Sequence, residues 1–154
     1  MRTYPGVTRR AVLMGIALGA VAACTEPAPP PPPDPLAALA ERAEADAALA
    51  GAVAKAVPSL ADAAGEVARV RGEHASALKR EVERERPPVS STTPPPPPAP
   101  PKAPTEPKAA LAALTKGLTD AQKQAAALVG TLPRHRAGMV GSVAAACASL
   151  KEVL

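Results

Sequence analysis

The sequence predicts an all-α protein, a four-helix bundle in which two antiparallel helical hairpins are joined by a long proline-rich crossover. Hydrophobic residues make up 47% of the 154 positions, but the chain has one tyrosine, no phenylalanine and no tryptophan. It also contains 21 prolines. Strands favour aromatic and β-branched residues, and proline interrupts their hydrogen-bonded ladders. We therefore expect alanine-rich helices separated by proline-rich segments.

Residues 1–23 are predicted to be an export signal. A basic segment ending in Arg9 and Arg10 precedes an apolar run from Ala11 to Ala23. This run is shorter than the roughly 20 residues that span a bilayer, but it suits the apolar region of a signal peptide. Paired arginines before an apolar run are typical of a twin-arginine translocation signal, and Sec export is the alternative.

The last residues of this segment, Val21-Ala22-Ala23-Cys24, resemble a bacterial lipobox. This motif predicts cleavage before Cys24 and diacylation of its thiol, and two acyl chains hold a protein stably at a membrane. The alternatives are a soluble secreted protein and an uncleaved anchor. With Cys24 acylated, Cys147 has no partner for an internal disulfide, and its small apolar neighbours predict a buried, unreactive thiol.

Residues 24–34 follow as a proline-rich tether, whose composition favours polyproline II. Asp34 and Pro35 then predict a helix start, because aspartate caps a helix and proline is tolerated at its first position. This first helix should end near Ala56, before Pro58.

A second helix is predicted from Ser59, which forms a capping-box-like pattern with Asp62, to about Arg86. Its short connection to the first helix predicts an antiparallel hairpin. Residues 87–107 include 11 prolines, so we expect an extended or flexible crossover that contributes nothing to the core.

The second hairpin completes a bundle over residues 35–154. Its first helix should begin near Thr105-Glu106-Pro107 and end near Val129, and the last helix should run from about Pro133 to Leu154. Apolar residues recur in both helices at alternating spacings of three and four, which predicts one buried stripe per helix. Alanine at many of these positions predicts close helix packing.

Two polar residues interrupt the stripes of the first hairpin. Asp46 lies within the stripe Leu36, Leu39, Ala43, Asp46, Ala50, Val53 and Val57. His74 lies within the stripe Leu60, Ala63, Val67, Val70, His74 and Ala77. In an antiparallel hairpin their side chains lean toward each other, so we predict a buried polar pair. Its role is either structural, fixing helix register, or that of a metal or small-ligand contact.

Three stretches carry a family resemblance: Asp34 to Leu39, Arg71 to Leu78, and Gly141 to Ala148. Together they resemble the ferritin-like exported lipoproteins of actinobacteria, a family without an assigned activity. The resemblance implies a ferritin-like order of the two hairpins. It implies no iron chemistry, because ferritin-like di-iron sites use Glu-x-x-His, and the residues three before His74 and His135 are an arginine and a leucine.

Net charge and the absence of catalytic motifs exclude several classes of function. The formal charge is +4, but three of the 18 basic residues lie in the predicted signal, so the mature chain is nearly neutral. We predict no nucleic-acid binding, because that function needs a basic surface and uses aromatic stacking. The sequence has no Ser/His/Asp set, CxxC motif, phosphate-binding loop or paired-carboxylate cleft, so we predict no enzyme and no cofactor.

Two further groups lie on the last predicted helix. Arg134, His135 and Arg136 form a basic cluster, which is either solvated or faces anionic lipid. His135, Met139 and Cys147 have donor atoms of the kind that soft metals bind, and the alternative is a surface histidine near core residues.

These observations predict a surface lipoprotein anchored to the extracytoplasmic face of a membrane, a non-catalytic bundle that acts as a binding or scaffolding module. Its predicted partners are the membrane, through the N-terminal lipid, and a protein that the sequence does not identify. The alternative is a metal- or small-ligand-handling domain that uses polar residues of the bundle interior.

Overall fold

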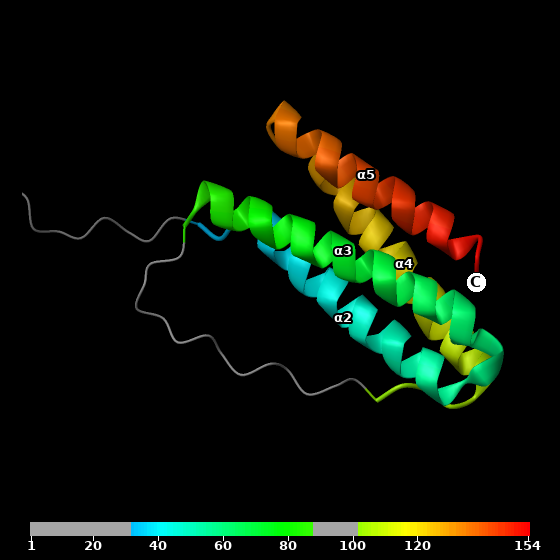
Figure 1. The fold of residues 1–154 in the computed structure, drawn as a ribbon. Helices are drawn as coiled ribbons and strands as arrows, with labels where there is room; N and C mark the ends of the chain where they lie inside the picture. The colour runs from blue at the N-terminus through cyan, green and yellow to red at the C-terminus, as the bar shows by residue number, and fades with distance from the viewer. Residues whose placement is uncertain (1–31, 88–101) are drawn as a thin grey trace, which may run out of the picture. The chain divides into compact units, whose positions relative to one another are not determined.

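A computed structural model describes residues 32–87 and 102–154, and within these ranges the chain is helical with no strand (Figure 1). The predicted all-α class and the four-helix bundle are confirmed at this level. The predicted signal, Cys24 and most of the tether and crossover lie outside the described residues. The elements are α2 (Pro35–Ala56), the 3-10 turn η1 (Pro58–Leu60), α3 (Ala61–Glu85), α4 (Pro107–Val129) and α5 (Arg134–Lys151).

Local sequence signals explain the start and end of α2. The Asp34 carboxylate accepts a hydrogen bond from the Leu36 backbone N–H at 2.9 Å, and Pro35 occupies the first helical position. The helix ends at Ala56, before Pro58. Both predicted bounds are confirmed, because a side-chain cap and a proline act within a few residues along the chain.

The predicted start of the second helix is wrong by one short turn. Residues Pro58–Leu60 form η1, and α3 begins at Ala61 without a side-chain cap. Ser59 therefore lies in the 3-10 turn, and the capping box with Asp62 does not form. An N-cap residue has a non-helical backbone, whereas Ser59 lies inside the turn.

The second pair of helices begins at a cap of the same kind. The Glu106 carboxylate accepts a hydrogen bond from the Ala109 N–H at 2.8 Å, and Pro107 is the first residue of α4. This helix ends at Val129, as predicted, and α5 runs from Arg134 to Lys151, so it ends before the predicted Leu154. No helix in the described ranges is both long and apolar enough to cross a bilayer.

The four helices pack around one alanine-rich core. In Figure 1, α2 lies along α3 and α4 lies along α5, while α2 also contacts α4. Small side chains let the helix backbones approach closely. The larger buried apolar side chains are Leu36, Leu39, Val53, Val57, Val67, Leu78, Leu114, Leu118, Val140, Val143 and Leu150.

The buried face of α3 differs from the predicted stripe. The buried residues of this helix are Ala64, Val67, Arg71, Ala75, Leu78 and Glu81. Val70 and His74, which the prediction placed in the core, are only half-buried. Alanine and valine occur on both candidate faces of α3, so the packing against the other helices selects between them. The selected face carries a positive charge, Arg71, of which 1% is exposed.

Candidate functional site

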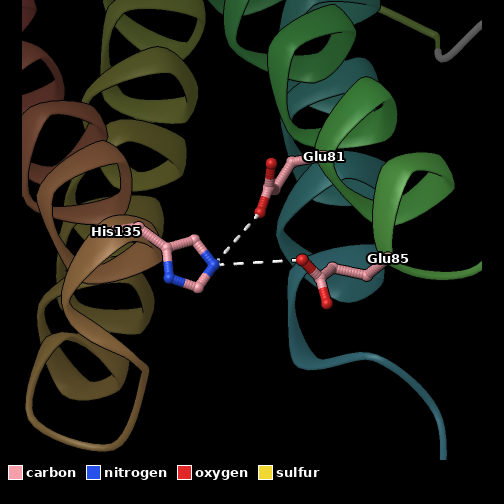
Figure 2. A group of neighbouring side chains, drawn as sticks. All are labelled: Glu81, Glu85 and His135. Carbon is pink, nitrogen blue, oxygen red and sulfur yellow. Dashed lines mark ion pairs between the residues drawn. The ribbon is translucent and has the colours of Figure 1, made fainter.

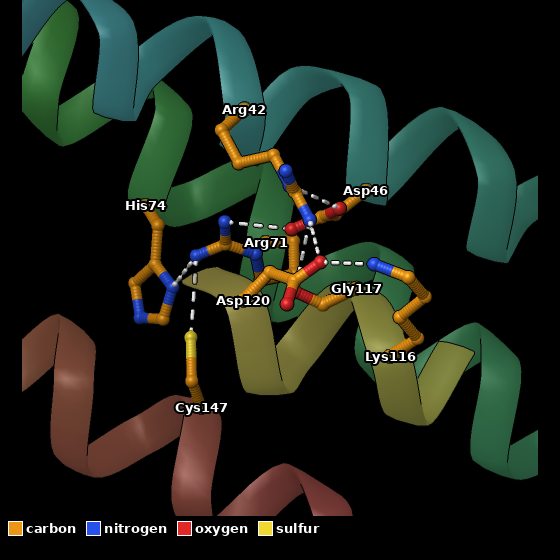
Figure 3. A network of polar contacts seen from close by, with 8 residues as sticks. All are labelled: Arg42, Asp46, Arg71, His74, Lys116, Gly117, Asp120 and Cys147. Carbon is orange, nitrogen blue, oxygen red and sulfur yellow. Dashed lines mark hydrogen bonds and ion pairs between the residues drawn. The ribbon is translucent and has the colours of Figure 1, made fainter. Parts of the chain in front are cut away.

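Arg71 lies at the centre of a polar network inside the bundle (Figure 3). Its Nη2 donates to Oδ2 of Asp46 on α2 at 2.9 Å. Its Nη1 lies 3.2 Å from Nδ1 of His74 and 3.5 Å from Sγ of Cys147 on α5. One guanidinium therefore joins α2, α3 and α5, and its charge is balanced in the interior by the Asp46 carboxylate.

The network continues from Asp46 toward the surface of α4. Arg42 donates from Nε to Oδ1 of Asp46 at 3.2 Å and from Nη2 to Oδ2 of Asp120 at 3.3 Å. The same Nη2 lies 3.5 Å from the backbone oxygen of Gly117. A hydrogen bond from Lys116, with the charge of Arg42 in addition, lowers the pKa of Asp120. Asp46 thus has two arginine partners, one buried and one near the surface.

His74 is neutral in this arrangement. A guanidinium is a donor and never an acceptor, so Nδ1 of His74 accepts from Arg71 and the proton of the imidazole lies on Nε2. Burial lowers the pKa of His74, and the positive charge of Arg71 lowers it further. Cys147 is buried, as predicted, and burial raises the pKa of its thiol. Arg71, a permanent cation, thus lies beside a neutral imidazole and a protonated thiol.

The predicted contact between Asp46 and His74 takes a different form. Within the described ranges no hydrogen bond or ion pair joins these two residues directly, and each contacts Arg71 instead. Sequence reasoning missed Arg71, which it considered only as the residue that breaks a Glu-x-x-His pattern. One signal was present: Arg71 lies four residues after Val67 and seven before Leu78, on the face that both occupy.

The predicted soft-metal group does not assemble. His135 and Cys147 are twelve residues apart on one helix, about 18 Å along its axis. Cys147 contacts Arg71 in the interior, whereas His135 is exposed at the start of α5.

The predicted basic cluster is also divided. Arg136 is buried, and its Nη2 lies 2.8 Å from both carboxylate oxygens of Asp34, while its Nε lies 3.3 Å from Oε1 of Glu81. Arg134 and His135 are exposed. Arg136 therefore joins the first turns of α5 to the start of α2 and the end of α3, and it does not contribute to a basic surface.

A second polar group surrounds Glu81 at this end of the bundle (Figure 2). Hydrogen bonds from Arg84 lower the pKa of Glu81, and the charges of Arg136 and His135 add to the effect. Nε2 of His135 lies 3.9 Å from Oε1 of Glu81 and 3.9 Å from Oε1 of Glu85. Of these groups, the sequence analysis named His135 and Arg136 as members of a basic cluster, and it did not place either of them beside Glu81.

A small cavity lies between α2, α3 and α4 beside Asp46. Its volume is about 10 Å³, about the smallest that can hold one water molecule. Its lining residues are Asp46, Leu49, Val67, Ala113, Leu114, Gly117 and Leu118. A ligand larger than water does not fit here without movement of the helices.

Gly117 makes room for the Asp46 carboxylate, and this gives a testable contrast between two glycines. A Cβ at position 117 would lie 3.1 Å from Oδ1 of Asp46, whereas a Cβ at Gly72 would contact nothing within 4 Å. We expect Gly72→Ala to raise the free energy of unfolding by roughly 0.5–1 kcal/mol, the helix preference for alanine. Gly117→Ala should not raise the free energy of unfolding, because the added methyl group would crowd the Asp46 carboxylate. Urea unfolding monitored by circular dichroism measures both, and equal gains would contradict the close approach.

Comparisons with protein-family models, with curated proteins and with solved structures found no match to this chain. Its function is therefore inferred from its own residues and their geometry.

Proposed function

We propose that the protein is a membrane-anchored surface lipoprotein whose ferritin-like bundle is non-catalytic and acts as a binding or scaffolding module. One observation carries the non-catalytic part: a buried arginine, Arg71, occupies the bundle interior, where ferritin-like proteins place their metal ligands. The lipid anchor rests on the predicted acylation of Cys24.

Ion pairs support antiparallel pairing in the first hairpin. Asp46 of α2 pairs with Arg71 of α3, and Glu44, two residues earlier, pairs with Lys79, eight residues later. The partner number on α3 rises as the number on α2 falls, which is the order expected of antiparallel helices. In the second hairpin, Lys151 of α5 contacts Gln122 of α4 at 2.7 Å, across the turn that follows Val129.

The placement of the two hairpins supports a ferritin-like order. Asp34 and Arg136 pair at 2.8 Å, so α2 and α5 begin at the same end of the bundle. Because α4 leads into α5 through a short turn, α4 ends there too and begins at the opposite end. The end of α3 and the start of α4 then lie at opposite ends of the bundle, which supports the order of helices in ferritin-like folds.

The charge of Arg71 argues against metal chemistry in the interior. A guanidinium stays protonated, so a metal cation beside it would add positive charge at low dielectric that the Asp46 carboxylate cannot also balance. The nearest carboxylate, Asp46, already accepts hydrogen bonds from Arg71 and Arg42. A di-iron centre needs several carboxylates that bridge the metals. Among the described residues there is one such carboxylate beside Arg71, that of Asp46, and its charge is already neutralised by arginines. Surface contacts are therefore the proposed mode of action.

The tether separates the lipid from the bundle. At about 3.1 Å per residue, a polyproline II segment between Cys24 and Asp34 would span roughly 30 Å. Such a spacer would leave the bundle free to contact partners beyond the membrane surface. Crosslinking on intact cells, followed by identification of the captured protein, tests this role. A bundle that captures no partner while its anchor is intact would contradict the binding and scaffolding proposal.

Mass spectrometry of the native protein tests the anchor. We expect a mature N-terminus at Cys24 that carries the mass of the lipid, with the protein in the membrane fraction. Cys24→Ala should abolish both the lipid mass and membrane retention, whereas the matched variant Cys147→Ala should keep both. A mature start at another residue without lipid mass would show that the lipoprotein proposal is wrong.

A further inference from the structure

Three side chains from two helices face a common gap at one end of the bundle (Figure 2). Glu81 and Glu85 are four residues apart and lie on one face of α3, and His135 lies in the first turn of α5. We propose that Glu81, Glu85 and His135 form a binding site for a first-row divalent metal ion, with Zn²⁺ as the reference ion. This site goes beyond the proposed function and depends on neither the lipid anchor nor the Arg71 network.

The distances between the three side chains fit coordination of a shared metal ion better than direct hydrogen bonds. Nε2 of His135 lies 3.9 Å from an oxygen of each glutamate, too far for a hydrogen bond. Zinc ligands lie at about 2.0–2.2 Å from the ion, so two of them stand up to about 4 Å apart on either side of it. The ligand atoms of all three residues lie within 4.8 Å of one another. Small side-chain rotations therefore bring all three atoms into coordination range.

The chemistry of the three ligand atoms limits which metal ions the site would bind. Imidazole nitrogen and carboxylate oxygen suit Zn²⁺, Mn²⁺ and Fe²⁺, whereas Ca²⁺ and Mg²⁺ prefer oxygen ligands alone. Glu81 is the fixed ligand, since only 9% of its side chain is exposed. The side chains of Glu85 and His135 are 40% and 58% exposed, which gives an ion access from solvent.

A buried donor beside Glu81 adds a second observation. The Arg136 side chain is 9% exposed, and its Nε has no hydrogen-bond partner among the described residues. This Nε forms an ion pair with Oε1 of Glu81 at 3.3 Å without making a hydrogen bond to it, so it borders the proposed site. Three protein ligands leave a zinc ion one position for water. The oxygen of that water would accept a hydrogen bond from Nε–H of Arg136, which donates none to the described residues.

Arg84 holds the two carboxylates when no ion is bound. It donates to both oxygens of Glu81 at 2.7 and 2.9 Å and lies 2.8 Å from Glu85. Its side chain is 56% exposed, and ion pairs of exposed side chains are weak. A divalent ion must displace this arginine, so Arg84 and the ion compete for the same oxygens. Removal of Arg84 should therefore strengthen metal binding.

Calorimetric titration of the purified full chain with Zn²⁺ tests the site. We expect one ion per chain, and His135→Ala should weaken binding at least about tenfold. Arg84→Gln should strengthen binding by about two- to fivefold, the factor that corresponds to a surface ion pair. Opposite signs for the two variants distinguish competition at the site from general loss of structure, and helical circular dichroism should stay unchanged in both.

Matched variants exclude the other donors of the chain. His74→Ala changes the second of the two histidines, and Glu83→Gln changes an exposed glutamate between the two proposed ligands; neither should alter the affinity. With Co²⁺ as the probe, the absorption band of thiolate ligation should be absent, which excludes Cys24 and Cys147. Zinc affinity that His135→Ala leaves unchanged or Arg84→Gln lowers, or no binding up to about 1 mM Zn²⁺, would overturn the proposal.

Discussion

Replacement of Arg71 by methionine should lower the free energy of unfolding by roughly 3–5 kcal/mol, the usual cost of removing one partner of a buried ion pair. The change leaves the Asp46 carboxylate in the interior without its partner at 2.9 Å. Arg42 remains, but its side chain is 34% exposed and neutralises Asp46 less completely. Urea unfolding monitored by helical circular dichroism measures the loss.

A matched control and a double variant assign this loss to the ion pair. Arg80→Met makes the same chemical change at an exposed position of α3 and should cost less than about 0.5 kcal/mol. Leucine has nearly the shape of aspartate, so adding Asp46→Leu to Arg71→Met should recover most of the stability. A double-mutant cycle of Asp46 with His74 should give a smaller coupling energy than a double-mutant cycle of Asp46 with Arg71. Additive losses at Asp46 and Arg71 would contradict their interaction.

Asp34→Ala should lower the free energy of unfolding by roughly 3 kcal/mol or more, because this carboxylate has two roles. It caps α2 through the Leu36 N–H, and it accepts two hydrogen bonds from the buried Arg136. Alanine removes the cap and also leaves the guanidinium with Glu81 as its remaining ionic partner. Denaturant unfolding of the full chain measures the combined effect.

Two variants separate these roles. Asparagine caps a helix about as well as aspartate, so Asp34→Asn should lose only the ionic contribution. Glu106→Ala removes the exposed cap of α4 and should cost about 1 kcal/mol, the contribution of a cap alone. Equal losses for Asp34→Ala and Glu106→Ala would show that the pair of Asp34 with Arg136 does not stabilise the fold.

The helices and their ends could be predicted from the sequence. Composition excluded strands, and the pairs Asp34-Pro35 and Glu106-Pro107 marked helix starts that the structure retains. These signals are reliable because a cap and a proline act on the backbone groups of the next few residues. The predicted start of α3 was wrong because Ser59 belongs to a 3-10 turn. The same residues permit either a 3-10 turn or the first turn of an α-helix.

The buried face of α3 and both polar clusters were decided by tertiary structure alone. Alanine lies on several faces of this helix, so its periodicity left two stripes that differ in their polar members, His74 and Arg71. An arginine is stable in the interior only where a carboxylate meets it. For Arg71 that carboxylate is Asp46 of α2, and for Arg136 it is Asp34, 102 residues away. Partners so far apart leave no local pattern, and only packing of the helices brings their charges together.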